Sequence, residues 1–495
     1  MVTAGLSAKG FGLSDTLNSL EALHRLPARI RTEFHESIAL ARRFIDEVVR
    51  PVHMQIDRSV MEDNDFLPVD VLRQANEWGL FTRWVPKMFG GKGKNMLSLY
   101  PFMEEISSVC AGLANLIGVH YLGVSVLCSS GNARVINRIL RDVASQEKKG
   151  NPCIISLAWT EPGAGTDQCE GPLLDRAKVR TSATRVAGGY RVNGSKVFIS
   201  AGHLCTWHMA VCYEDLKRPA DTLMLLAVKT GTDGFSFGHK EHKMGQKACV
   251  ASELIFEDCF VPEENVCFST EHLRPFGINA NDAVLKFIGM FPAVSQPGVG
   301  AVGTGVARGA WQTAMGYAAS KRAAGERLID QEWAQLVLAD MYTNVVTSRT
   351  LYMEAAYAVA MKSMIRMLFD KRLFYLSYYL PRWFFTLFVS PWFNLGIVNR
   401  LYRQMTFVAP RVEDEKLVAG IGSLSKVACS DLAMRNSEMA LDLMGADGTR
   451  HEFGAEKFLR DAKLLQIYEG TNEINRINLF LKNMAPGIPD VRVFE

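Results

Sequence analysis

Residues 461–479, DAKLLQIYEGTNEINRINL, decide how the last part of this chain folds. Residues 460–467 favour a helix, Gly470 ends it, and Thr471 suits the N-cap of a second helix. This pattern places Glu469 at the break. A carboxylate in an apolar pocket has a raised pKa, because burial disfavours the charged form, and it then suits a general base acting on a weak carbon acid. The alternative is a solvated Glu in an ordinary helix–turn–helix.

The C-terminal part of the chain, residues 276–495, is predicted to be a helical bundle. From about residue 297 the 3.6-residue period returns, and residues 298–321, GVGAVGTGVARGAWQTAMGYAASK, are rich in glycine and alanine, so this helix can approach its neighbours closely. Residues 331–361, 417–444 and 453–479 complete four helical stretches of the length found in bundles.

Two other regions precede the bundle. Residues 1–150 read as a helical domain, with apolar positions at helical spacing. Residues 151–275 change to short β-rich runs, and Asn193-Gly194 within GYRVNGSKVFIS predicts a type I′ hairpin turn. Within this region LAWTEPGAGTDQCE, residues 157–170, is a loop whose backbone N–H groups are free to meet a ligand oxygen or a ring edge.

Composition limits the class of protein. The chain has 495 residues, 48% of them apolar and 22% charged, which fits a globular protein of two or three domains. A net charge of +3 gives no case for a nucleic-acid partner. The ten cysteines form no C-x-x-C pair, so neither structural zinc nor another metal site is expected. The N-terminus lacks the pattern of a signal or transit peptide, so a cytoplasmic location is the expectation.

Four motifs occur in order along the chain: TEPGAGTD, NGSKVFISAG, KMGQKACVASELIFEDCFVP and YEGTNEINR. Together they resemble the acyl-CoA dehydrogenase family of flavoproteins, over nearly the whole chain except one insertion. The resemblance implies a helical N-terminal domain, an antiparallel β-barrel or sandwich domain and a C-terminal four-helix bundle, assembled as a homodimer or homotetramer. It also implies FAD as cofactor, oxidation of an acyl-CoA thioester to its trans-2-enoyl form, and electron transfer to an electron-transfer flavoprotein.

The resemblance also implies roles for individual residues. Glu469 matches the catalytic base, which removes the α-proton while the β-hydrogen leaves as hydride to flavin N5. The positions that match FAD contacts are Leu157, Trp159, Thr160, Thr166, Phe198, Ser200, Lys321, Arg322, Thr471 and Glu473. The positions that match substrate contacts are Thr166, Gln296 and Gly470.

Some positions depart from the family pattern. A run before the first bundle helix normally carries an Asp and an Arg that help hold substrate, where this chain has Ala293 and Gln296. On the side that reaches the adenine end of FAD in a neighbouring subunit, Ala324 replaces an aromatic residue. Asp442 and Ala446 replace a Gln and a Gly there, and an unpaired acid would repel a pyrophosphate.

An insertion at about residues 363–412 interrupts the bundle. Between residues 371 and 412 there is no Asp or Glu, while six Lys and Arg residues lie among many aromatic ones. The uncharged run WFFTLFVSPWFNLGIVN, residues 383–399, contains Pro391 and is short for a membrane span, so a broken helical hairpin in the bilayer interface is predicted. Residues 371–403 would then attach the protein at the cytoplasmic face of the membrane. The alternative is that the insertion covers the bundle or contacts another subunit.

Three functions remain open from the sequence. The first is an FAD-dependent acyl-CoA dehydrogenase with Glu469 as base. The second is an acyl-CoA oxidase of the same fold that reduces oxygen directly. The third is a catalytically inactive acyl-CoA-binding or membrane scaffold protein. The altered adenine-side positions favour this third function, and the intact YEGT and TEPGAGTD motifs argue against it.

Overall fold

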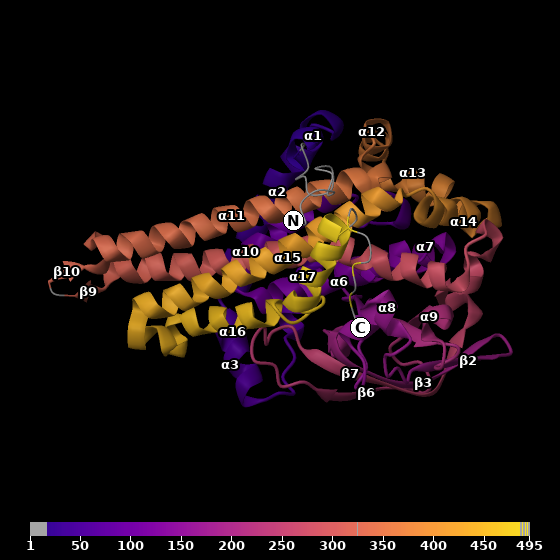
Figure 1. Ribbon diagram of the computed structural model, residues 1–495, viewed down its shortest axis with the longest axis horizontal. Helices are drawn as coiled ribbons and strands as arrows, with labels where there is room; N and C mark the ends of the chain where they lie inside the picture. Colours follow the sequence, from indigo (N-terminus) through magenta and orange to yellow (C-terminus); the bar gives the residue numbers. More distant parts are fainter. Residues whose placement is uncertain (1–16, 324, 486–487, 489–490, 492, 494–495) are drawn as a thin grey trace, which may run out of the picture.

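A computed structural model describes residues 17–323, 325–485, 488, 491 and 493. It confirms the predicted class of fold, with a helical N-terminal region, a sheet in the middle and a helical C-terminal region (Figure 1). The N-terminal helices are α1 (Asn18–Arg25), α2 (Arg29–Phe44), α3 (His53–Glu62), α4 (Val69–Glu77), α5 (Leu99–Ser107), α6 (Ala111–Ser129) and α7 (Ala133–Lys148).

The middle region forms one sheet of eight strands in the order β6-β7-β3-β2-β4-β5-β8, with β1 paired in parallel to β4. Neighbouring strands are otherwise antiparallel, apart from a parallel contact between β2 and β4. The strands are β1 (Ile155–Ala158), β2 (Ser182–Val186), β3 (Gly189–Ser200), β4 (Trp207–Tyr213), β5 (Leu223–Lys229), β6 (Phe235–Lys240), β7 (Ala251–Pro262) and β8 (Val266–Ser269), with short helices α8 (Gly171–Leu174) and α9 (Pro219–Thr222) between them.

The two-residue period of the strands divides the sheet between two apolar cores. In β4, Met209 and Val211 belong to the main core shared with the helices, whereas Ala210 and Cys212 belong to a second core within the sheet. The register Ala210↔Leu226 continues this division into β5. Because both faces of these strands are buried, they read as continuous apolar runs rather than as alternating ones.

The predicted hairpin turn at Asn193-Gly194 is wrong. Both residues lie inside β3, and the chain reverses five residues earlier, at Gly188 with φ of +80°. A register shift leaves Asn193 without a partner in β7, although it pairs with Ser182 of β2, and its Oδ1 accepts a bond of 2.8 Å from the Asp258 N–H. A side chain at Gly194 would lie 2.7 Å from the Thr181 backbone, so the glycine serves a close approach of strands.

The C-terminal bundle consists of α10 (Ala280–Ser320), α11 (Glu332–Lys362), α15 (Val412–Met444), α16 (Ala455–Leu465) and α17 (Asn472–Leu479). A two-stranded hairpin of β9 (Arg322–Ala323) and β10 (Glu326–Arg327) joins α10 to α11 at the far end of the bundle (Figure 1). Helix α10 begins at Ala280, so the prediction that helix resumes near residue 297 is wrong. Pro292 and Pro297 lie inside the helix without ending it, and Ala293 and Gln296 are helical residues rather than part of a preceding run.

Helix α10 approaches the N-terminal helix α5 at two glycines, as its composition predicted. A side chain at Gly305 would lie 2.4 Å from the Glu104 carbonyl oxygen, and one at Gly309 would lie equally close to that of Ser108. Between them the buried Arg308 guanidinium donates to Glu104 at 3.0 Å and to Glu105 at 2.9 Å. Burial would raise the pKa of Glu105, but the bonds and charge of Arg308 hold that pKa below its ordinary value.

We expect Arg308→Met to lower the free energy of unfolding by about 3–5 kcal/mol, because it leaves two buried carboxylates short of a cation. Urea unfolding followed by fluorescence measures this change. Arg73→Met is the matched control, since Arg73 pairs with Asp70 at 3.1 Å on the surface and its loss should cost less than about 1 kcal/mol. Equal losses in both variants would contradict a structural role for the buried arginine.

The insertion is a series of short helices on the surface of the N-terminal region, at the upper right of the view (Figure 1). It contains α12 (Lys371–Tyr379), α13 (Arg382–Phe384) and α14 (Gly396–Arg403), with short 3₁₀- and π-helical segments before, between and after them. Two helical stretches elsewhere, Ala111–Ser129 and Val412–Thr449, are long and apolar enough to cross a membrane by composition. The fold buries 67% and 61% of their apolar windows, respectively, as expected for core helices.

Candidate active site

The junction between α16 and α17 has the break and the cap that the sequence predicted. Helix α16 ends at Leu465, and the backbone turns left-handed at Glu469 (φ +55°) and Gly470 (φ +74°). The Thr471 hydroxyl then accepts a bond of 3.4 Å from the Ile474 N–H and caps α17. A left-handed glutamate is uncommon, and this conformation directs its side chain away from both helix axes.

Two buried side chains hold the carbonyl groups of this junction. The Asn475 amide nitrogen donates to the carbonyl oxygens of Glu469 (3.2 Å), Gly470 (2.9 Å) and Thr471 (3.0 Å). The Lys426 ammonium group of α15 donates to the Gly470 carbonyl at 2.7 Å. Sequence reasoning missed both residues, although a lysine in the otherwise uncharged run LSKVAC was a signal that could have found Lys426.

The Glu469 carboxylate is half-buried and faces α10. Its Oε2 accepts a hydrogen bond of 2.7 Å from the Ser295 hydroxyl. Burial raises the pKa of Glu469, and the Ser295 bond and the Lys426 charge offset part of that rise. Burial in turn lowers the pKa of Lys426 to about 8, with the nearby Glu469 charge opposing it. The site therefore contains a carboxylate that is a stronger base than an exposed one, beside a buried cation.

The loop at residues 157–166 packs against the same face of α10. It begins at the end of β1, where the Trp159 ring lies 5.1 Å from the Phe291 ring of α10. The Thr160 carbonyl accepts a bond of 2.9 Å from the Val197 N–H of β3. Past the loop, the Glu170 carboxylate accepts a bond of 2.7 Å from Asn478 of α17. The structure thus brings the loop, β3, α10 and the Glu469 junction together.

A buried ion pair fixes the loop to β3. The Lys196 ammonium group donates to the Glu161 carboxylate at 2.7 Å and to the Trp159 carbonyl at 3.0 Å, and both charged side chains are fully buried. Glu161 also accepts bonds from the backbone N–H groups of Arg180 and Thr181. Sequence reasoning did not single out this pair.

Several polar groups around the loop lack partners within the described chain. The Trp159 indole nitrogen is buried without a hydrogen bond. The hydroxyls of Thr160, Thr166 and Ser200 are half-buried, and no described residue bonds to them. Phe198 has a left-handed backbone (φ +59°), and its ring is 59% exposed. An exposed ring face beside unpaired donors fits a flat heteroaromatic group such as a flavin, as does the half-buried Leu157 beside them.

The two remaining predicted contact residues near Glu469, Gln296 and Glu473, differ in burial and in their hydrogen bonds to the protein. Gln296 is buried, and its amide donates to Asn475 at 2.6 Å and accepts from Ser423 at 3.3 Å, so it ties α10 to α15 and α17. Glu473 is exposed at the start of α17, and the bonds from its own backbone N–H and from Thr471 hold its pKa below the ordinary value.

The predicted adenine-side residues lie at the opposite end of the bundle, on the β9–β10 hairpin (Figure 1). Lys321 pairs with Asp447 at 2.8 Å, and Arg322 donates to the Gly325 carbonyl at 3.0 Å. In one chain they are therefore far from Glu469. Asp442 and Ala446 are exposed near the same end of the bundle, and Ala324 lies outside the described residues.

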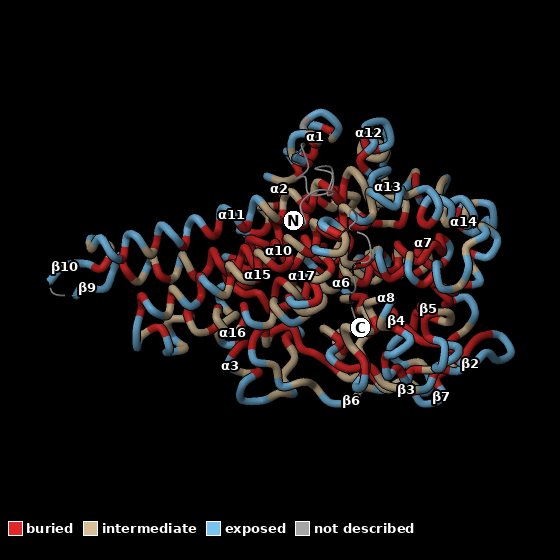
Figure 2. Tube along the Cα trace, in the orientation of Figure 1, coloured by how far each residue is buried: buried red, intermediate tan, exposed pale blue. Residues whose placement is uncertain are grey.

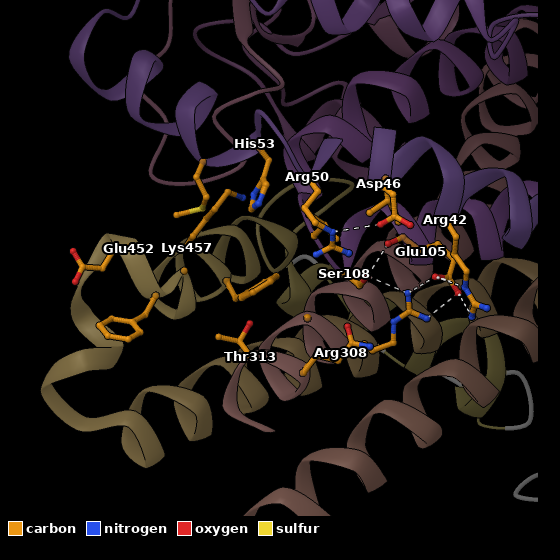
Figure 3. Close-up of a pocket in the computed structure, with 18 residues that line it drawn as sticks. Arg42, Asp46, Arg50, His53, Glu105, Ser108, Arg308, Thr313, Glu452 and Lys457 are labelled. Atoms are coloured by element: carbon orange, nitrogen blue, oxygen red, sulfur yellow. Dashed lines mark hydrogen bonds and ion pairs between the residues drawn. The ribbon is translucent and has the colours of Figure 1, made fainter. Parts of the chain in front are cut away.

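A cavity of about 690 Å³ opens between the N-terminal helices and the bundle (Figure 3). Its charged groups are largely paired with one another, for example Arg50 with Asp46 and Arg308 with Glu105. Burial lowers the pKa of His53 on its wall to about 4, so that imidazole is neutral at pH 7. None of the site residues predicted from the sequence lines this cavity.

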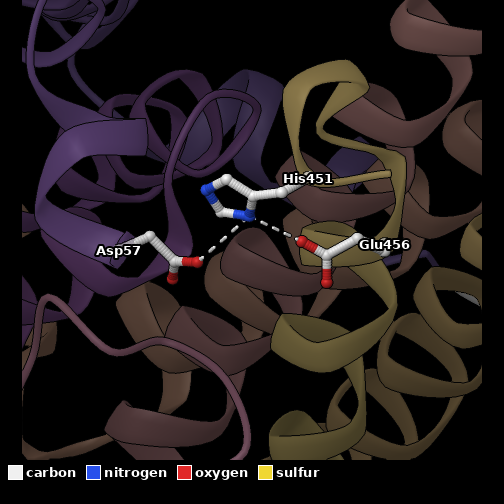
Figure 4. A group of neighbouring side chains, drawn as sticks. All are labelled: Asp57, His451 and Glu456. Atoms are coloured by element: carbon white, nitrogen blue, oxygen red, sulfur yellow. Dashed lines mark hydrogen bonds and ion pairs between the residues drawn. The ribbon is translucent and has the colours of Figure 1, made fainter. Parts of the chain in front are cut away.

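Asp57, His451 and Glu456 form a cluster of the kind that binds metals (Figure 4). The His451 Nδ1 lies 2.9 Å from Glu456 and 4.0 Å from Asp57. However, the Arg460 guanidinium bonds both carboxylates, at 2.5 Å and 2.6 Å. Their charge is thus neutralised by an arginine, which a divalent cation would have to displace.

Comparison with known families gives the class of protein. The sequence matches the acyl-CoA dehydrogenase N-terminal domain over residues 32–147, the middle domain over 156–259 and the C-terminal domain over 293–368 and 399–482. These matches define an oxidoreductase that acts on acyl-CoA. The chain belongs to the acyl-CoA dehydrogenase family, whose members depend on FAD. The gap in the C-terminal match falls on the insertion.

Individual relatives agree with this assignment. The chain is 26% identical to a cyclohex-1-ene-1-carbonyl-CoA dehydrogenase of Syntrophus aciditrophicus, over 84% of this chain and 83% of the relative. It is also 26% identical to a probable acyl-CoA dehydrogenase of Mycobacterium leprae, over 93% and 96%. The fold resembles butyryl-CoA dehydrogenase from Megasphaera elsdenii, with a TM-score of 0.67, 22% identity and coverage of 90% and 97%. It also resembles a glutaryl-CoA dehydrogenase of Mycobacterium smegmatis in complex with FADH2, with a TM-score of 0.65, 18% identity and coverage of 94% and 97%.

We expect Lys196→Met to lower the free energy of unfolding by about 3–5 kcal/mol, because the Glu161 charge would remain buried without its cation. Adding Glu161→Gln to this variant should recover part of the loss. Lys229→Met is the matched control, since Lys229 forms a surface pair with Asp142 at 3.2 Å and should cost less than about 1 kcal/mol. Chemical denaturation of these three variants and of Glu161→Gln alone completes the cycle, and additivity of the two buried substitutions would show that the pair does not couple.

Proposed function

We propose that this protein catalyses the FAD-dependent α,β-dehydrogenation of an acyl-CoA thioester to the trans-2-enoyl-CoA, with Glu469 as the base. The observation that carries the proposal is the half-buried Glu469 carboxylate, which has a raised pKa. It bonds to Ser295, one turn of α10 from the Phe291 ring that packs against Trp159 of the 157–166 loop. The α-hydrogen of a thioester is weakly acidic, so its removal needs a base of this kind, placed within hydrogen-bonding reach of the carbon.

Residues around Glu469 prepare it for this step. The Ser295 hydroxyl holds one carboxylate oxygen towards α10, and the other oxygen is left to receive the proton. Asn475 binds the carbonyl of Glu469 and Lys426 binds that of Gly470, so the carboxylate is aimed by its main chain rather than by rotamer choice alone. Gly470 has no side chain, so a thioester group can approach the N–H group of this turn closely.

The loop and β3 would hold the cofactor, which supplies a hydride acceptor when bound. Trp159 and Leu157 offer apolar contact, and Thr160, Thr166 and Ser200 offer hydroxyl donors to ring edges. The N-terminal end of α17, capped by Thr471, favours negative charge nearby. Lys321 and Arg322 would serve the adenine end of a cofactor bound by a neighbouring copy, so a homodimer or homotetramer is part of the proposal. Since Lys321 is already paired with Asp447, Arg322 is the freer cation.

The proposed electron acceptor is an electron-transfer flavoprotein or a membrane-linked carrier. An acyl-CoA oxidase would instead release hydrogen peroxide during aerobic turnover. Anaerobic titration with a series of acyl-CoAs, followed by the visible flavin band, tests the reaction and its preferred chain length together. A protein that carries FAD but is not bleached by any acyl-CoA would support the inactive scaffold.

Glu469→Gln should bind acyl-CoA but bleach the flavin band about 100- to 10,000-fold more slowly, because the amide cannot take a proton. Since burial raises the pKa of Glu469, its ionised form destabilises the folded state at neutral pH, so the variant should unfold at an equal or higher urea concentration. Stopped-flow absorbance and urea unfolding measure the two effects. Glu438→Gln, at an exposed position of α15, is the control and should change neither.

The pH dependence of kcat/KM should show an acid limb above the ordinary range of a carboxyl pKa. Activity falls as the pH drops through the raised pKa of Glu469, because the base becomes protonated. Lys426→Met should move this limb to higher pH, since the Lys426 charge lowers the pKa of Glu469. The exposed Lys463→Met should leave it in place. A limb that moves to lower pH in Lys426→Met would rule out Glu469 as the titrating group.

A further inference from the structure

The inner side of the insertion is fixed to the N-terminal region and the sheet. Phenylalanines along the insertion turn inward, and five of their rings are buried: Phe369, Phe374, Phe385, Phe393 and Phe407. The Phe393 ring lies 4.9 Å from Phe89. The Lys87 ammonium group forms no ion pair with a carboxylate of the described residues, but it donates to three carbonyls around the end of α12, including that of Tyr378 at 2.6 Å. The insertion is therefore a firmly placed surface layer.

The outer side of this layer is apolar, which is unusual for a surface helix. Large apolar side chains point outward along its whole length, and α12 to α14 are largely exposed at the edge of the molecule (Figure 2). Trp383 and Trp392 are 60% and 63% exposed. Trp383 and Phe384 both lie against the Phe388 ring, so the aromatic groups are contiguous. The outer face consists of Leu373, Leu376, Tyr379, Trp383, Leu387, Phe388, Trp392, Leu395, Ile397 and Leu401.

The cations of the insertion have no acidic partners. Lys371, Arg372, Arg382, Arg400, Arg403 and Arg411 form no ion pair with any described carboxylate. Three of them bond to backbone carbonyls instead, as Lys371 does to His24 at 2.7 Å and Arg403 to Gly131 at 3.2 Å. Residues 371–412 contain no Asp or Glu. The layer therefore presents uncompensated positive charge around its apolar face.

The apolar outer face and the unpaired cations together indicate what kind of partner covers the insertion. A second copy would place the same six cations against themselves in a two-fold interface, and like charges oppose that contact. An anionic membrane surface offers hydrocarbon for the outward rings and negative headgroups for the arginines. The uncharged run 383–399 is divided among α13, the turns Phe385–Val389 and Ser390–Asn394, and α14, so it suits a position on a bilayer rather than across it.

We propose that the outer face of residues 371–403 binds the surface of a membrane rich in anionic lipid, with α12 to α14 lying in the headgroup region. The outward tryptophans insert at the interface. Arg372, Arg400 and Arg411, whose side chains bond to no described carbonyl or carboxylate, meet lipid phosphates. This places the protein at a membrane surface without residues 371–403 crossing the bilayer, and it is independent of the reaction at Glu469.

The test is co-sedimentation of the full-length protein with vesicles of phosphatidylcholine, with and without phosphatidylglycerol. The wild type should bind the anionic vesicles, and added salt should weaken this binding. Trp383→Ser/Leu387→Ser/Trp392→Ser should weaken it by about tenfold or more. Trp333→Ser/Leu336→Ser is the matched control, because these α11 residues are 49% and 70% exposed on another element, and it should bind as the wild type does. Flavin content and acyl-CoA titration should be the same in all of these proteins.

A second variant separates charge from apolar contact. Arg372→Gln/Arg400→Gln/Arg411→Gln should lose the preference for phosphatidylglycerol and the salt dependence. Unchanged vesicle binding in both triple variants would overturn the proposal. So would a wild type that ignores vesicles while the serine variant changes its sedimentation coefficient, because the face would then be a contact between copies of this chain.

Discussion

The left-handed backbone at Glu469 is the constraint on which the site depends. A non-glycine residue in this conformation costs on the order of 1–2 kcal/mol, so neighbouring contacts must hold it there. Asn475 and Lys426 supply those contacts by binding three successive carbonyls at the break. Their own positions depend on Gln296 and on the Asn472 side chain, which accepts from Lys426 at 2.6 Å. The geometry of one carboxylate thus rests on the contact between three helices of the bundle.

The same region joins the three parts of the chain. Helix α10 contacts the N-terminal helix α5 through Arg308, the loop after β1 through Phe291, and the Glu469 junction through Ser295. These contacts follow one another along a single helix. A shift of the sheet region or of the N-terminal helices relative to α10 would therefore disturb the surroundings of the carboxylate, even without a change at residue 469.

Local signals in the sequence were enough for some elements and not for others. Gly470 and Thr471 predicted the helix break and its cap, because both act through their own backbone preferences. Asn193-Gly194 misled, because pairing of β3 with β7 over a long stretch overrides a local turn preference. Pro297 marked no helix boundary, since the fold supports α10 on several sides. The roles of Ser295, Lys196 and Asn475 could not be predicted from local sequence patterns. Ser295 and Lys196 bond to residues distant in the sequence, and Asn475 bonds to backbone groups whose position depends on the turn at Glu469.

Helix α10 also sets a length scale for the whole molecule. It has 41 residues, and at about 1.5 Å per residue it is about 60 Å long. The Glu469 junction lies beside its first half, and the β9–β10 hairpin follows its last residue. Under the proposed function, one dinucleotide would therefore need groups from two protomers. Retention of FAD would then depend on protein concentration, because dilution that separates the protomers would also release FAD from the enzyme.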